Sequence, residues 1–191
     1  GRLAAGVAGL LARGLNCPPT TSAGRWFDAI AGLLGLSLRQ PQEAAAAQAL
    51  QAAATAWLAA HGEPQPPGRV PDLLAVAAHC ADVGQAGTDP RRAAALFHTT
   101  LADWLAQAAT AAARQAGTRQ VALVGGCFHN RLLADLVQRR LLAAGLLPLQ
   151  PQLQGPGDAG LALGQAWVAA ATLAQPAPHD HHHPEETTAC A

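Results

Sequence analysis

The chain has 191 residues, 50% of them hydrophobic and 13% charged, and its twelve basic and twelve acidic side chains give a formal net charge of zero. This length is enough to bury a sizeable core, and the balanced charge gives no sign of a nucleic-acid-binding surface. Every basic residue is an arginine. The sequence therefore excludes phosphate loops and Schiff bases that depend on lysine.

The sequence also lacks the marks of a membrane or secreted protein. Arg, Gln, His or Asp interrupts every apolar stretch before it reaches membrane-spanning length, and the N-terminus does not resemble a signal peptide. Cys17, Cys80, Cys127 and Cys190 are far apart in sequence. We therefore expect reduced thiols in a cytoplasmic protein. The chain begins with Gly1 and contains no Met, so we expect a fragment or a processed product.

The first part of the chain predicts only helices and loops. Segments rich in Pro and Gly, at 16–20 and 61–71, predict connections between the helices. Apolar residues at helical spacing indicate helices over about 1–14, 22–36, 42–60, 71–81 and 90–115.

After residue 120 the pattern changes to alternating strands and helices. Strands are predicted at 121–124 and 146–149, with helices at 130–144 and 158–174. This alternation predicts a parallel pair joined by a crossover, and hence an α/β domain over 1–174. The last helix is apolar all round, which predicts deep burial. Because two strands cannot cover so much apolar helix, we expect sequence outside this chain to complete the sheet.

The C-terminal segment 175–191 is polar and is expected to be disordered. It carries a histidine cluster made of His179, His181, His182 and His183. Such a cluster is able to capture Ni²⁺, Cu²⁺ or Zn²⁺ weakly, or it is incidental.

The run V-A-L-V-G-G-C-F-H-N-R-L-L at 121–133 reads as a strand, a Gly-Gly turn and a helix that opens at Asn130. Gly125 and Gly126 have no Cβ, so a ligand is able to approach the main chain closely. The helix N-terminus that follows favours an anion such as phosphate. The alternative is an ordinary tight turn with Asn130 as an N-cap.

Two carboxylates are further candidates. Asp158 lies in G-P-G-D-A-G at the start of the last helix, where it is either an N-cap or a ligand of a metal that orients phosphate. Asp28 lies on the polar edge of an apolar helix, where it is either a solvated carboxylate or an acceptor for a ribose hydroxyl.

Two other polar residues are expected to be structural. His98 lies beside Phe97 in a strongly apolar helix. These surroundings favour a half-buried histidine with satisfied nitrogens over a catalytic base. Cys127 follows the two glycines near a helix start, where the pKa of a thiol is able to fall, but a packing thiol is the favoured interpretation.

Taken together, four stretches resemble the C-terminal end of the HypF family, the carbamoyltransferases that mature nickel–iron hydrogenases. They occur in the family's order and spacing, over about residues 1–172. The stretches are L-N-C-P-P-T-T-S-A-G-R-W-F-D-A-I-A-G-L-L-G at 15–35, F-H-T-T-L-A at 97–102, the run at 121–133, and G-D-A-G-L-A-L-G-Q-A at 157–166.

The resemblance implies the second lobe of an actin-like, ribonuclease H-like domain with a large helical portion. It implies an enzyme that uses carbamoyl phosphate and ATP to form carbamoyl-adenylate, and then carbamoylates the C-terminal cysteine of a HypE-like acceptor protein. By similarity, Gly125 and Gly126 face the phosphate, Asn130 and Asp28 face the nucleoside, and Asp158 is the last ligand of a divalent metal (Zn, Fe or Mg). The preceding domains of such a protein are absent from this chain.

The chain departs from the family pattern at two points. The family's Y-E-G before the Ala-rich helix is replaced by Gln40, Pro41 and Gln42, and nothing matches the first lobe's paired histidines. These departures leave two alternatives open. One is a relative of the tRNA threonylcarbamoyl-transferases, although the chain has no basic patch. The other is a catalytically inactive lobe that acts as a binding or scaffold module.

Overall fold

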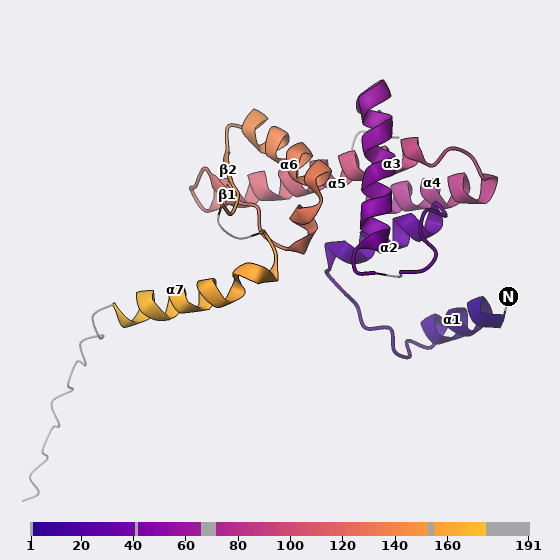
Figure 1. Cartoon of the computed structure of the whole chain (residues 1–191), viewed down its shortest axis with the longest axis horizontal. Coiled ribbons are helices and arrows are strands. Elements are labelled where there is room, and N and C mark those ends of the chain that lie inside the picture. The colour runs from indigo at the N-terminus through magenta and orange to yellow at the C-terminus, as the bar shows by residue number, and fades with distance from the viewer. Residues whose placement is uncertain (1, 41, 66–71, 153–154, 175–191) are drawn as a thin grey trace, which may run out of the picture.

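The computed structural model describes residues 2–40, 42–65, 72–152 and 155–174, and within them the chain is mostly helical with a small parallel sheet (Figure 1). The first, helical part is made of α1 (Arg2–Ala12), α2 (Ala23–Leu33), α3 (Ala45–His61), α4 (Leu73–Ala86) and α5 (Arg91–Gln115). The second part is made of β1 (Gln120–Ala122), the 3₁₀ turn η1 (Gly126–His129), α6 (Arg131–Ala143), β2 (Leu147–Leu149), the 3₁₀ turn η2 (Asp158–Gly160) and α7 (Leu161–Leu173).

Helix α5 is the centre of the core, because α3, α4 and α6 all pack against it. Its residues from Ala93 to Ala102 are buried without interruption. Phe97 of α5 meets Phe27 of α2 edge to face, with ring centroids 5.2 Å apart, a geometry that aromatic pairs prefer. Each fully buried Phe, Leu or Ile stabilises the fold by about 1.5–3 kcal/mol, so this cluster fixes the relative positions of the helices.

Helix α4 approaches α2 closely through a glycine. A Cβ built on Gly84 would lie 1.9 Å from the carbonyl oxygen of Leu33, so only glycine allows the two backbones to come this near. At the other end of α4, the carboxylate of Asp72 accepts hydrogen bonds from the N–H groups of Leu74 and Ala75. This N-cap satisfies two of the helix's free donors.

Strands β1 and β2 pair in parallel, with Gln120 opposite Leu147 and Ala122 opposite Leu149, and α6 is the crossover between them. The predicted parallel pair is therefore confirmed, although each strand has three residues instead of the four expected. The expected α/β class needs correction for the described residues, because they form a mostly helical domain whose sheet has only these two strands.

The predicted burial of the last helix is wrong. No residue of α7 is buried; Trp167 is 75% exposed and Leu173 is 86% exposed. Figure 1 shows α7 projecting away from the helices around α5. The helix is apolar all round, as predicted, but the described residues supply no element that covers it.

None of the described helices is both long enough and apolar enough to cross a membrane. The expected disorder of 175–191 and the histidine cluster within it lie outside the described residues.

Candidate functional site

The Gly125–Gly126 turn leaves β1 and opens a space beside the main chain. Gly125 has a φ of +106°, a conformation that side-chain-bearing residues rarely adopt. A Cβ built on either glycine meets no atom within 4 Å. The sequence prediction of a turn at which a ligand is able to approach the backbone therefore fits the geometry.

The helix that the sequence predicted to open at Asn130 is confirmed, but a 3₁₀ turn that the sequence did not predict lies between this helix and the glycines. The 3₁₀ turn η1 separates the glycines from α6, which begins at Arg131. Within the part of the chain that the structure describes, no hydrogen bond is formed by the N–H groups of Gly126 and Cys127. These two donors at the start of η1 are available to an anion that lies against the glycines.

Asn130 is the N-cap of α6, as one of the two sequence interpretations predicted. Its Oδ1 accepts a hydrogen bond from the N–H of Leu133 across 3.0 Å, and the residue is buried. Its Nδ2 donates to Nε2 of His98 across 3.1 Å. Both ends of this amide are therefore engaged inside the protein, which gives Asn130 a structural role next to the turn.

His98 is fully buried, not half-buried as expected, and both of its ring nitrogens have partners. Nδ1 lies 2.9 Å from the carbonyl oxygen of Ala94, and Nε2 faces the Asn130 amide. A carbonyl only accepts and an NH₂ group donates, so the proton belongs on Nδ1. Burial lowers the pKa of His98 from 6.5 to about 4. The predicted histidine with satisfied nitrogens is confirmed.

The loop before α7 lies directly against the Gly-Gly turn. The N–H of Gly125 donates to the carbonyl oxygen of Pro156 across 2.6 Å. On the same loop, Gly157 lies against His129 and the Cα of Gly126. Two motifs some thirty residues apart in sequence thus meet in the fold.

Asp158 follows this loop with an exposed side chain. The structure assigns the N-caps of η2 and α7 to Gly157 and Gly160, so the interpretation of Asp158 as a cap is wrong. Its carboxylate has no hydrogen-bond or ion-pair partner among the described residues. It is therefore free to meet a ligand.

Asp28 forms an ion pair with Arg25 across 2.7 Å, and its side chain keeps 27% of its surface exposed. Its Oδ1 also accepts a hydrogen bond of 3.4 Å from Nε2 of Gln40, whose Oε1 accepts from the N–H of Ala46. Gln40 thus links Asp28 to the start of α3. Helix α2 contacts η1, so Asp28 lies on an element beside the turn. Pro41, which like Gln40 departs from the family pattern before the Ala-rich helix, lies outside the described residues.

Cys127 is a half-buried thiol that packs against the core. Burial raises its pKa, the opposite of the fall that the sequence left open, in agreement with the packing interpretation.

The described residues do not complete a metal site. Among them there is no group of three or more His, Cys, Asp or Glu side chains placed to hold an ion. A site built from this part of the chain would have Asp158 as its single carboxylate, which is too few ligands for Zn²⁺ or Mg²⁺.

Comparison with known proteins identifies the family. The profile described as "Carbamoyltransferase, Kae1-like Domain, second subdomain" matches residues 2–165. The chain belongs to the HypF carbamoyltransferase family. It corresponds to the C-terminal Kae1-like subdomain of that protein, and the mostly helical fold with its small sheet is this subdomain's fold.

Several HypF proteins are similar to this chain over most of its length. The carbamoyltransferase HypF homolog of Cupriavidus necator is 47% identical over 97% of this chain and 49% of its own length. HypF of Rhizobium leguminosarum bv. viciae is 38% identical over 91% of this chain and 22% of its own. The chain thus spans about half or less of the length of these relatives.

Two crystal structures share the fold. Full-length HypF in a phosphate- and nucleotide-bound form superposes with a TM-score of 0.78 at 24% identity, over 91% of this chain and 23% of that one. HypF of T. kodakarensis has a TM-score of 0.74 at 28% identity, over 87% and 22% respectively. At 24% identity, the similarity to the phosphate- and nucleotide-bound structure shows a shared fold and nothing further.

Sequence reasoning missed two residues at this site. His129 stands between the turn and the G-P-G loop, and Gln40 contacts Asp28. The only signal for His129 was the pair of glycines at 155 and 157, whose partner lies far away in sequence. Gln40 was noticed only as a departure from the family pattern.

Proposed function

We propose that this chain forms one side of the nucleotide- and phosphate-binding site of a HypF-type carbamoyltransferase. The overall reaction consumes carbamoyl phosphate, ATP and one water molecule and forms carbamoyl-adenylate, releasing phosphate and pyrophosphate. The thiolate of the C-terminal cysteine of a HypE-like acceptor then attacks the carbamoyl carbon. A carbon–sulfur bond forms, the bond from that carbon to the AMP oxygen breaks, and AMP leaves.

The observation that carries this proposal is the hydrogen bond between the N–H of Gly125 and the carbonyl oxygen of Pro156. It joins an open backbone turn to the loop that presents Asp158, so the two candidate motifs form one site. Membership of the HypF family supplies the reaction, and the preceding domains of such a protein would supply the other side of the site.

The proposed roles follow from the geometry. The N–H groups of Gly126 and Cys127 have no partner among the described residues, and they would donate to phosphate oxygens. Oriented N–H groups of this kind stabilise negative charge that builds during adenylate formation. The partly exposed carboxylate of Asp28 would accept from a ribose hydroxyl. Asn130 would act on the nucleoside side of the site by holding the turn, because its amide is engaged with His98 and Leu133.

Asp158 is proposed as a single ligand of a divalent metal, Zn, Fe or Mg, which would offset the charge of bound phosphate. The described part of the chain does not complete that site. The role of Asp158 therefore depends on ligands from elsewhere in the protein.

A second candidate, an inactive lobe that serves as a scaffold, is favoured by one contact. Gln40 donates to the Oδ1 of Asp28, and Arg25 pairs with its Oδ2. A ribose hydroxyl would therefore compete with these partners for the carboxylate. An active enzyme would still bind ATP, whereas a scaffold would not need to bind it.

A chimaera tests the proposal. Residues 2–165 of this chain replace the matching segment of the Rhizobium leguminosarum HypF, and mass spectrometry follows transfer of carbamoyl to the acceptor cysteine. We expect transfer that requires ATP and carbamoyl phosphate. Asp158→Ala should abolish it, while Asp135→Ala, an exposed carboxylate on α6, should not. Full activity of the Asp158→Ala protein would remove Asp158 from the site, and an inactive but folded chimaera would favour the scaffold.

A further inference from the structure

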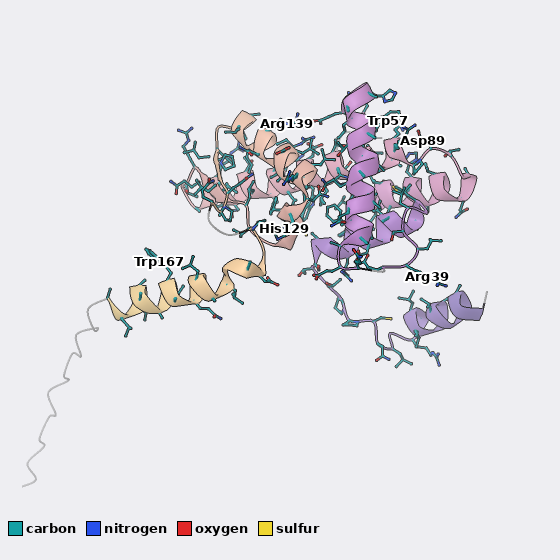
Figure 2. The ribbon with its side chains drawn as sticks, viewed as in Figure 1. Arg39, Trp57, Asp89, His129, Arg139 and Trp167 are labelled. Atoms are coloured by element: carbon teal, nitrogen blue, oxygen red, sulfur yellow. The ribbon has the colours of Figure 1, made fainter. Side chains whose placement is uncertain are left out.

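The imidazole of His129 fills a space that two glycines leave open. A Cβ built on Gly155 would lie 2.8 Å from Cε1 of His129, and a Cβ built on Gly157 would lie 2.8 Å from its Nε2. Real Cβ atoms do not come this close to another heavy atom. The ring therefore lies directly on the backbone of the loop. Figure 2 shows His129 beside the point where the chain turns towards α7.

Space, not backbone conformation, explains the glycine at position 157. Gly157 has a φ of −97°, which residues with side chains also adopt, so alanine is excluded there only by the ring of His129. Gly125 differs from Gly157, because its φ of +106° requires glycine without any neighbour.

The ring and a hydrogen bond act on the same short loop. Between the two glycines, the carbonyl oxygen of Pro156 accepts from the N–H of Gly125. His129 ends η1, the turn that Gly126 begins. The loop is therefore held at its middle by the main chain of the Gly-Gly turn and at both sides by a side chain from the end of η1.

We propose that His129 is a positioning residue, whose imidazole packs on Gly155 and Gly157 and thereby holds the Asp158 loop against the Gly125–Gly126 turn. The consequence for catalysis rests on the proposed function, because that function places a ligand between the turn and Asp158. The packing itself does not depend on it.

The first test measures amide hydrogen exchange by NMR in the full 191-residue chain. In His129→Ala, the Gly125 amide should exchange about tenfold faster or more, because the loop that carries its acceptor opens more often. The matched control is His61→Ala, an exposed imidazole that stacks on Trp57 of α3, away from the loop; it should leave the Gly125 amide unchanged. Unchanged exchange in His129→Ala overturns the proposal.

A second pair of variants tests the contact from the loop side. Because the ring is the movable end of a side chain, Gly157→Ala should displace it without unfolding the protein. The nuclear Overhauser contacts from the ring to the loop should disappear, and Gly125 exchange should rise as in His129→Ala. In the double variant the rise should be no greater than in either single one. Rises that multiply would overturn the proposal, because they would show that the two residues act independently.

Rescue separates positioning from a general loss of structure. His129→Gln restores a flat side chain that is able to lie on the two glycines, so it should return Gly125 exchange to near the wild-type rate. Exchange that stays as fast as in His129→Ala contradicts the proposal.

The same variants in the chimaera report on function. His129→Ala should raise the KM for ATP several-fold, and His129→Gln should restore it. If the wild-type chimaera transfers no carbamoyl group while exchange follows the pattern above, the proposed function fails and the positioning role stands. If transfer occurs but the His129 variants leave both KM and exchange unchanged, the positioning role fails and the proposed function stands.

Discussion

Nδ2 of Asn130 donates a hydrogen bond to Nε2 of His98 across 3.1 Å, so the central helix α5 fixes the residue that caps α6. The same Asn130 side chain accepts from the N–H of Leu133. The Gly-Gly turn enters α6 through this residue. The position of the turn is therefore tied to the buried core rather than to the surface.

Asn130→Ala should destabilise the chain by about 2–4 kcal/mol, because it removes an N-cap and leaves the buried Nε2 of His98 without a donor. Asn130→Ser keeps a capping oxygen but loses the donor to His98, so its cost should be smaller. Urea unfolding followed by circular dichroism measures both. Equal stability of Asn130→Ala and wild type would show that the His98 contact contributes nothing.

Stability should depend on pH through His98. In the folded chain burial lowers the pKa of His98 from 6.5 to about 4, so between these values the unfolded chain binds the extra proton and the folded chain does not. The free energy of unfolding should therefore fall as pH is lowered from about 6.5 to about 4. The full loss is about 3 kcal/mol, at about 1.4 kcal/mol for each unit of pKa.

The control for this pH dependence is His98→Gln, which does not titrate and is able to accept from Asn130. Its stability should fall less steeply over the same range. Thermal unfolding at half-unit pH steps makes the comparison. A wild-type curve parallel to that of His98→Gln would mean that another group is responsible.

Gly84→Ala should destabilise the helical core by about 1–3 kcal/mol, the usual cost of overpacking, since its Cβ would lie 1.9 Å from the carbonyl oxygen of Leu33. Gly32→Ala is the matched control. Gly32 lies within α2 and a Cβ there meets nothing within 4 Å, so alanine should be neutral or stabilise by up to about 1 kcal/mol. Chemical denaturation of both variants tests the close approach of α4 to α2, and equal midpoints would rule it out.

The features of this site that the sequence predicted are local ones. Period and residue type predicted the strand before Gly125, the crossover helix and the cap at Asn130, because each depends on a few neighbouring residues. The parallel pairing followed from the alternation of strands and helices. The turn η1 was not predicted, since four residues show no period.

The features that the sequence did not predict depend on contacts between distant segments. The partner of His98 is 32 residues away, and His129 meets a loop that begins 26 residues later in the numbering. The composition of α7 predicted an apolar surface correctly. It did not indicate whether this chain would cover that surface, and the described residues do not.

The most direct test of the proposed site is calorimetric titration of the HypF chimaera with ATP, comparing wild type with Gly126→Val. Gly126 has no positive φ, and a Cβ there meets nothing within 4 Å, so valine should leave the fold intact while filling the space assigned to phosphate. We predict an unchanged melting temperature and an ATP affinity at least about tenfold weaker, equivalent to about 1.4 kcal/mol. ATP affinity equal to that of wild type would contradict the account, because it would show that no phosphate lies against this turn.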